Sequence, residues 1–120
     1  MGKFVIRETN TGWKFDLKAT NGEVIATSEV YTTKAACVNG AQSVAKNAPA
    51  ANFADLTEGG EATNPKFELF QDKGGEFRFR LTARNGEIIA VSEGYKAKGS
   101  CENGIESVRK NAADAETEKI

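Results

Sequence analysis

Two stretches of the chain, residues 13–20 and 77–84, alternate strictly between apolar and polar side chains. In "WKFDLKAT" the aromatic and aliphatic residues point one way and the charged residues the other, and "FRFRLTAR" repeats this order. A period of two places successive side chains on opposite faces of a strand. Each stretch is therefore predicted to be a strand with one face in the core.

An Asn-Gly dipeptide follows each of these strands. Asn21-Gly22 and Asn85-Gly86 both lead into another strand pattern, "EVIATSE" or "EIIAVSE". Asn-Gly between two strands is a strong hairpin signal and predicts a type I′ turn, in which both central residues have positive φ. A further strand, "KFVIRE" or "KFELFQ", precedes each pair. Each half of the chain is thus predicted to open with a three-stranded meander.

The hydrophobic period then changes to that of an amphipathic helix in both halves. Thr32 or Thr33 can cap the first helix, whereas the second has no obvious cap. Gly40 and Gly104 flank the apolar stripes, where each costs about 1 kcal/mol relative to alanine, which indicates a close approach of helix to sheet. The stripes consist of Cys37, Ala41, Val44 and Ala48, and of Cys101, Ile105, Val108 and Ala112.

These patterns belong to a tandem repeat. Residues 13–48 and 77–112 align without a gap and are identical at 20 of 36 positions. One meander with one helix buries too little surface to be stable alone, so the two repeats are expected to share a sheet and a core. The sequence predicts a single pseudo-symmetric α+β domain over residues 1–120. It divides into repeat one (3–57), a polar, Gly-rich linker (58–65) and repeat two (66–120).

The composition is that of a soluble globular protein without a charge bias. The 120 residues are 39% hydrophobic and 28% charged, with a net charge of −1, so no global field attracts nucleic acid or membrane. No apolar run approaches the roughly 18 residues of a membrane span, and "MGKFVIRE" is unlike a signal peptide. We expect a cytoplasmic protein without membrane association. Its two cysteines should stay reduced, and alone they cannot complete a zinc site.

Little in the sequence points to catalysis. The absence of histidine removes the commonest general base and the Ser-His and Cys-His nucleophile systems. Cys37 and Cys101 lie on the apolar stripes, as buried structural thiols do. The "GYKAKGS" segment, residues 94–100, lacks the lysine that a phosphate loop places before its hydroxyl residue. The sequence therefore predicts no enzyme, no catalytic residue, no cofactor and no metal.

The polar side of the second strand provides one candidate site in repeat two. Arg78, Arg80 and Arg84 form a row that could hold phosphates or carboxylates if both helices pack on the other face. Phe70 is out of phase with its inward neighbours and could serve as a stacking platform for single-stranded nucleic acid. We favour the alternative, an exposed face on which these arginines pair with carboxylates on neighbouring strands. The carboxylates in reach are those of Glu68, Glu87 and Glu93.

Lys98 is a second candidate contact for an anion. It lies near the predicted start of the second helix, where free N–H groups and the helix dipole favour negative charge. Lys34 occupies the equivalent place in repeat one. The alternative for both residues is a lysine in solvent.

The second repeat carries a long motif, "NGEIIAxSEGYxxKxxCENGIESVxKNA", that resembles the YegP-like family of small bacterial proteins. The resemblance covers nearly the whole chain. It implies β3-α-β repeats in one antiparallel-rich sheet with both helices on one face and the C-terminal strands, such as "ANFADL", exchanged between repeats. It also implies that single-copy members form homodimers and that this two-copy chain is a monomer. Because the family has no established activity, it supplies no site residues. Repeat one departs from the motif at Val30, Val38 and Ala41.

We therefore expect a small non-enzymatic binding module that meets a protein partner through its open sheet face or a strand edge. The alternative is an anion or single-stranded nucleic-acid binder that uses the arginine row. The sequence alone does not identify the ligand or the partner. It also does not decide whether residues 114–120 form an ordered strand.

Overall fold

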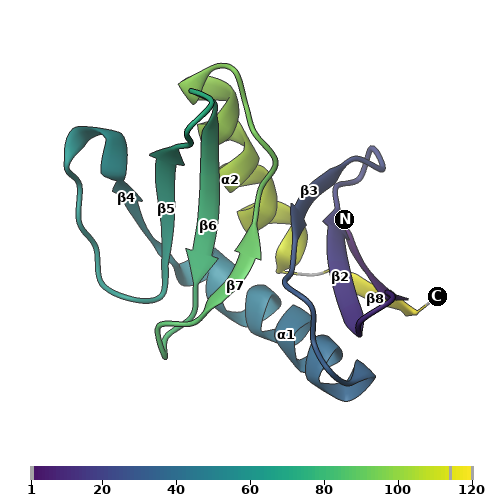
Figure 1. Ribbon diagram of the computed structural model, residues 1–120. Helices are drawn as coiled ribbons and strands as arrows, with labels where there is room; N and C mark the ends of the chain where they lie inside the picture. The colour runs from purple at the N-terminus through teal and green to yellow at the C-terminus, as the bar shows by residue number, and fades with distance from the viewer. Residues whose placement is uncertain (1, 114, 120) are drawn as a thin grey trace.

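Each repeat opens with the predicted three-stranded antiparallel meander. The computed structural model describes residues 2–113 and 115–119, and Figure 1 shows its elements along the chain. The strands are β1 (Lys3–Glu8), β2 (Trp13–Lys18) and β3 (Val24–Thr27) in repeat one, and β5 (Lys66–Gln71), β6 (Phe77–Thr82) and β7 (Ile88–Val91) in repeat two.

The fourth strand of each repeat joins the other repeat. β4 (Asn52–Asp55) pairs in parallel with β5, and β8 (Glu116–Lys119) pairs in parallel with β1. The two meanders meet through β3 and β7, which share a single antiparallel pair, Thr27 with Val91. One eight-stranded sheet results, in the order β4-β5-β6-β7-β3-β2-β1-β8. The exchange of C-terminal strands that the resemblance implied is confirmed.

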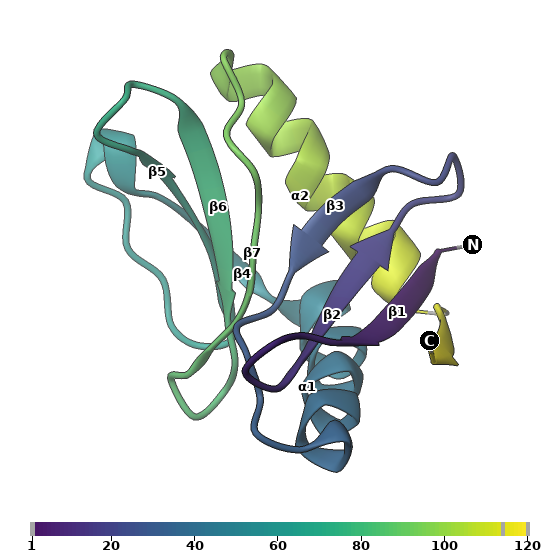
Figure 2. The ribbon, with the colours of Figure 1, turned by 45° about the vertical axis from the view of Figure 1, so that its right-hand side comes forward.

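Both helices cover the same face of this sheet, as predicted (Figures 1 and 2). α1 (Lys34–Asn47) packs on β1 and β2 but also on β7, whereas α2 (Lys98–Ala112) packs on β6 but also on β3. Each helix therefore spans the junction between the repeats. Two short 3-10 turns, η1 (Ala48–Ala50) and η2 (Leu56–Glu58), follow α1 and β4. No helix among the described residues is long and apolar enough to cross a membrane.

The helix starts differ in the way that the sequence predicts. The hydroxyl of Thr33 accepts a hydrogen bond from the N–H of Ala36 at 3.1 Å and so caps α1. The equivalent position before α2 is Ala97, which has no side-chain cap. Both apolar stripes are buried in the core, including Cys37 and Cys101 at 0% exposure.

Three aromatic rings form the centre of the core in each repeat. Phe4 meets Phe15 edge to face at 5.7 Å between ring centroids, and Phe15 stacks on Tyr31 at 6.3 Å. These are the preferred geometries of aromatic pairs. In repeat two the same arrangement is formed by Phe67, Phe79 and Tyr95.

The glycine in each helix makes room for the tyrosine that precedes the helix. A Cβ atom built on Gly104 would lie 2.5 Å from the Tyr95 hydroxyl and 3.0 Å from the Phe79 ring. A Cβ atom on Gly40 would overlap the Tyr31 hydroxyl. The close approach that the sequence predicts is real, but its main partner is a tyrosine ring from the connecting segment rather than the sheet itself.

The prediction of type I′ turns at Asn21-Gly22 and Asn85-Gly86 is wrong. Only the glycines have positive φ, 86° at Gly22 and 89° at Gly86. The N–H of Gly22 donates to the carbonyl of Ala19 at 2.9 Å, and that of Ala19 donates to the carbonyl of Glu23 at 2.9 Å. A four-residue turn in which only the last residue is left-handed is a type I turn closed by a glycine bulge. The strand register also shifts by one residue near each turn, after Leu17 and after Leu81.

We expect Gly104→Ala to lower the free energy of unfolding by about 1–3 kcal/mol, because the new methyl group would displace the rings of Tyr95 and Phe79. Urea denaturation monitored by circular dichroism measures this. Gly99→Ala, in the exposed first turn of α2 with nothing within 4 Å of the new Cβ, is the matched control. It should be neutral or stabilising by up to about 1 kcal/mol. Equal effects of the two substitutions would contradict the packing explanation.

Cys37 and Cys101 should be unreactive toward a disulfide reagent such as Ellman's reagent in the native protein. Burial raises the pKa of both thiols, that of Cys101 to about 11, so little thiolate exists at neutral pH. Both should react stoichiometrically once urea unfolds the chain. Rapid labelling of either cysteine without denaturant would show that it is not a buried structural thiol.

Candidate functional site

The face of the sheet opposite the helices carries a row of charged and aromatic side chains. Because strand residues alternate between faces, Phe70 of β5 lies on this open face next to Arg78, its partner position in β6. Glu68 and Arg80 form the adjacent cross-strand pair. Three of the residues predicted as a site, Phe70, Arg78 and Arg80, are therefore brought together.

Arg80 is held by a carboxylate and a ring at once. Its Nε donates to Oε1 of Glu68 at 2.8 Å, and its guanidinium lies 4.8 Å from the centroid of Phe70. Burial alone would raise the pKa of Glu68, but the hydrogen bond from Arg80 and the charges of Arg80 and Lys66 outweigh it and lower the pKa. Phe70 is thus covered by an arginine rather than free to stack on a base.

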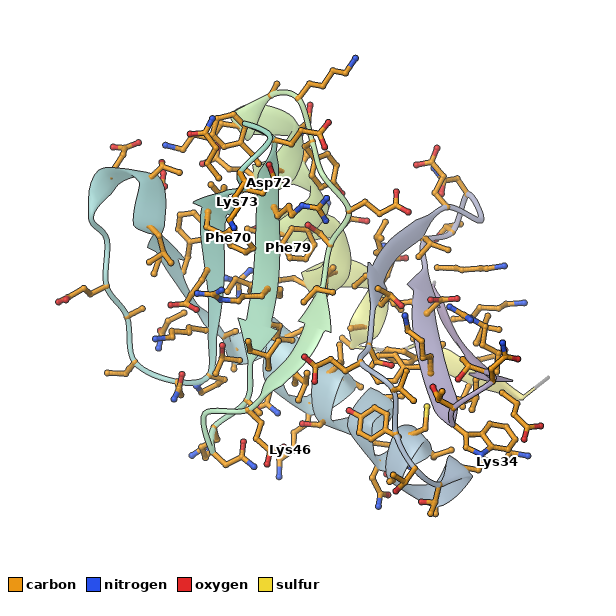
Figure 3. All side chains as sticks on the ribbon, in the orientation of Figure 1. Lys34, Lys46, Phe70, Asp72, Lys73 and Phe79 are labelled. Carbon is orange, nitrogen blue, oxygen red and sulfur yellow. The ribbon has the colours of Figure 1, made fainter. Side chains whose placement is uncertain are left out.

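Arg78 is part of the β5–β6 hairpin. Its Nε donates to Oδ2 of Asp72 at 2.7 Å, and the other carboxylate oxygen of Asp72 accepts from the N–H groups of Gly74 and Glu76 at 2.9 and 3.0 Å. The hydrogen bond from Arg78 contributes most to lowering the pKa of Asp72. Figure 3 shows Asp72 at the end of β5, close to Phe70. A phosphate could reach Arg78 only by displacing this carboxylate.

Arg84 does not belong to the row. The register of β6 shifts after Leu81, the strand ends at Thr82, and Arg84 lies in the β6–β7 hairpin. There it lines a groove with residues of α1, on the helix side of the molecule. The simple alternation from Arg78 to Arg84 fails because β6 ends two residues before Arg84, which lies inside the turn closed by the hydrogen bond from the N–H of Gly86 to the carbonyl of Ala83.

Lys98 also lies away from the open face. It forms ion pairs with Asp55 at the end of β4 and with Glu58 of η2, each at 2.5 Å. These hydrogen bonds raise its pKa to about 12. Lys98 therefore links the start of α2 to the end of the exchanged strand β4 through an ion pair. Its equivalent Lys34 instead lies over the ring of Trp13, 5.4 Å from the centroid.

A hollow on the open face, which sequence reasoning missed, lies where the two repeats meet. It has a volume of about 290 Å³ and is bordered by β2 and β3 of one repeat and β7 of the other. Four charged residues line it. Two of them, Arg7 and Asp16, form an ion pair at 3.0 Å. The other two, Lys14 and Glu93, have no ion-pair partner among the described residues. No sequence pattern predicts this hollow, because it depends on β3 and β7 being neighbours. Its lining is completed by Val24, Ala26, Thr27 and Val91.

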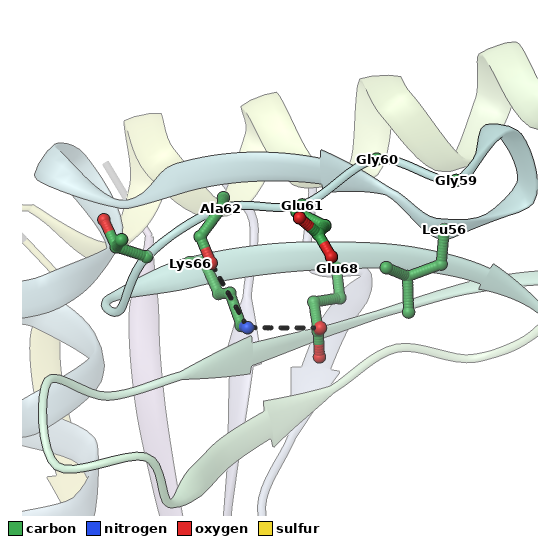
Figure 4. A pocket seen from close by; sticks show the side chains of 8 residues that line it. Leu56, Gly59, Gly60, Glu61, Ala62, Lys66 and Glu68 are labelled. Atoms are coloured by element: carbon green, nitrogen blue, oxygen red, sulfur yellow. Dashed lines mark hydrogen bonds and ion pairs between the residues drawn. The ribbon is translucent and has the colours of Figure 1, made fainter.

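A larger space, about 670 Å³, lies between the linker and β5 (Figure 4). Its two charged strand residues are already paired, since Lys66 lies 3.4 Å from Glu68 and donates to the carbonyl of Ala62 at 3.4 Å. Most of the remaining lining comes from the linker, residues 59–63. This space offers few unpaired polar groups for recognition.

The described residues contain no group of three or more histidine, cysteine, aspartate or glutamate side chains placed to hold a metal ion. They also place no base beside either cysteine that would lower its pKa, since neighbouring acidic groups and burial both raise it.

Comparisons with known proteins agree with this fold. The family model "Domain of unknown function (DUF1508)" matches residues 8–55 and 72–118, once in each repeat. A UPF0339 protein of Bordetella pertussis is 40% identical over 116 residues, which cover 97% of this chain and 93% of the relative.

Two solved structures are similar along almost the whole chain. The solution NMR structure of the protein of unknown function yegP from E. coli has 34% identity and a TM-score of 0.80, covering 98% of this chain and 91% of that one. That of a UPF0339 protein from Shewanella oneidensis has 32% identity and a TM-score of 0.81, covering 98% and 90%. The chain belongs to the DUF1508 (UPF0339) family, the YegP-like family that its second repeat resembles, and the function of this family is unknown.

Proposed function

We propose that this chain is a small non-enzymatic binding module that docks a protein partner on the open face of its sheet. The observation that carries the proposal is the hollow between the repeats. It sets apolar side chains, Val24 and Val91, beside the unpaired charges of Lys14 and Glu93. Protein interfaces combine an apolar centre with polar groups around it in this way.

The open face is a better docking surface than the outer edge of β4. The linker runs back along that edge, where the N–H of Gly60 donates to the carbonyl of Asp55 at 2.8 Å and the amide of Asn52 donates to Thr63 at 2.9 Å. Covering an edge strand in this way prevents another chain from adding to the sheet. In the part of the chain that the structure describes, no segment covers the hollow on the open face in this way.

Binding of single-stranded nucleic acid to the arginine row receives less support. Arg78 and Arg80 already donate to carboxylates, and Phe70 is covered by Arg80. Phosphate contacts would require these ion pairs to open, and the acidic partners would repel the approaching backbone. A protein partner can instead use the pairs as they stand, as part of a mixed polar rim.

Site-specific photo-crosslinking tests this proposal. A photoreactive amino acid in place of Val24, which is 38% exposed at the hollow, should form a discrete adduct with one protein in cells that express the chain. The same amino acid at Asn103, on the exposed surface of α2, is the control and should form none. Lys14→Glu should reduce the adduct about tenfold through lost charge complementarity, whereas Lys110→Glu on α2 should not.

Two outcomes would contradict the proposal. One is equal crosslinking from positions 24 and 103. The other is a salt-sensitive shift of the amide NMR signals of Phe70 and Arg80 on addition of a short single-stranded oligonucleotide, because phosphate binding releases counterions. The second outcome would favour the nucleic-acid function.

A further inference from the structure

A second surface with distinct chemistry lies on the helix side of the molecule, between α1 and the β6–β7 hairpin. A groove of about 380 Å³ separates them. Figure 3 shows Lys46 on α1 beside this hairpin. The polar side chains that line the groove belong to Asn39, Gln42, Ser43, Lys46, Asn47, Arg84 and Asn85.

The groove is basic although the whole chain is slightly acidic. Lys46 and Arg84 line it, no carboxylate does, and α1 contains no acidic residue along its length. Neither Lys46 nor Arg84 has an ion-pair partner among the described residues. Arg78, Arg80 and Lys98, by contrast, are all paired with carboxylates. Arg84 is thus the one residue of the predicted row whose charge is still available.

The neutral groups of the groove add hydrogen-bond donors. The carboxamides of Asn39 and Gln42 have no partner in the described part of the chain. The side-chain Oδ1 of Asn85 accepts from the N–H of Glu87 at 3.0 Å, which leaves the side-chain N–H₂ of Asn85 to donate elsewhere. A guanidinium, an ammonium and three carboxamides together form a donor-rich set that an anion with several acceptor oxygens can satisfy.

The partial negative charge at the C-terminal end of α1 would oppose an anion here, but another cation offsets it. Arg109 of α2 donates to the carbonyls of Ala48 and Ala51, directly after α1, at 3.3 and 2.7 Å. Arg109 therefore partly neutralises the negative charge at the C-terminal end of α1, and Lys46 is not needed for this.

The pseudo-symmetry of the fold provides an internal comparison. In the other half, between α2 and the β2–β3 hairpin, Thr20 replaces Arg84, Glu106 replaces Gln42 and Lys110 replaces Lys46. That surface carries one positive and one negative charge where the groove carries two positive charges. At these equivalent positions, the side chains on the α1 side carry a net positive charge and those on the α2 side are neutral overall.

We propose that this groove binds the phosphate group of a small phosphorylated ligand. Arg84 would contact two phosphate oxygens through its planar guanidinium, and Lys46 would add a point charge from the helix side. Gln42 and Asn85 would orient the remaining oxygens from opposite walls. The volume leaves room for part of the group esterified to the phosphate.

Amide NMR titration of the full chain tests the proposal with three probes: inorganic phosphate, adenosine monophosphate and adenosine. Both phosphate-containing probes should shift the signals of Gln42, Lys46 and Arg84, and adenosine should not. Arg84→Ala and Lys46→Ala should each weaken binding of adenosine monophosphate about tenfold, because each removes a charge-assisted hydrogen bond. Lys110→Ala, at the position equivalent to Lys46, is the matched control and should leave the affinity unchanged.

Tighter binding of the nucleotide than of inorganic phosphate would identify a phosphate ester as the preferred ligand, and equal affinities would identify free phosphate. Unchanged affinity in Arg84→Ala, shifts that map to α2 and the β2–β3 hairpin, or no shifts at millimolar phosphate would overturn the proposal. Both substituted side chains are exposed, so the variants should keep the native spectrum elsewhere. The site does not involve the open face, so this result is independent of the crosslinking experiment.

Discussion

The exchange of the final strands between the repeats is the interaction on which the rest of the structure depends. β3 and β7 share only one residue pair, Thr27 with Val91, so the two meanders would be weakly joined by their central contact alone. β4 and β8 add a parallel strand to the outer side of the opposite meander. Each meander therefore receives its outer parallel strand from the other repeat, and neither half completes its part of the sheet alone.

Side chains of the second helix reinforce this exchange. Arg109 lies over the ring of Phe67 at 5.0 Å and donates to the carbonyls of Ala48 and Ala51, which precede β4. Lys98 holds the other end of β4 through Asp55. Repeat one has alanine at the position equivalent to Arg109. The arginine contacts that support β4 therefore have no equivalent from α1 in repeat one.

The repeats share their core and differ on their surfaces, and the candidate functions lie in the differences. Phe4, Phe15 and Tyr31 correspond ring for ring to the aromatic residues of repeat two. On the open face, however, Arg80 and Phe70 stack in repeat two, whereas Asp16 and Arg7 occupy the equivalent positions and border a hollow. On the helix side, the groove between α1 and the β6–β7 hairpin is basic, whereas the equivalent surface between α2 and the β2–β3 hairpin is near neutral. Packing constrains the shared positions strongly, while solvent-facing positions are free to acquire separate binding chemistry.

The sequence by itself determined the elements that depend on local periodicity: the strand alternation, the helix stripes, the Thr33 cap and the repeat. It also placed Phe70, Arg78 and Arg80 on one face, because alternation holds within an unbroken strand. Tertiary structure decided the rest. The turn after β6 placed Arg84 on the helix side, carboxylates distant in sequence form ion pairs with Lys98, and the contact of β3 with β7 created the hollow. These outcomes follow from register and from strand order, which arise only when segments far apart in the chain pair with one another.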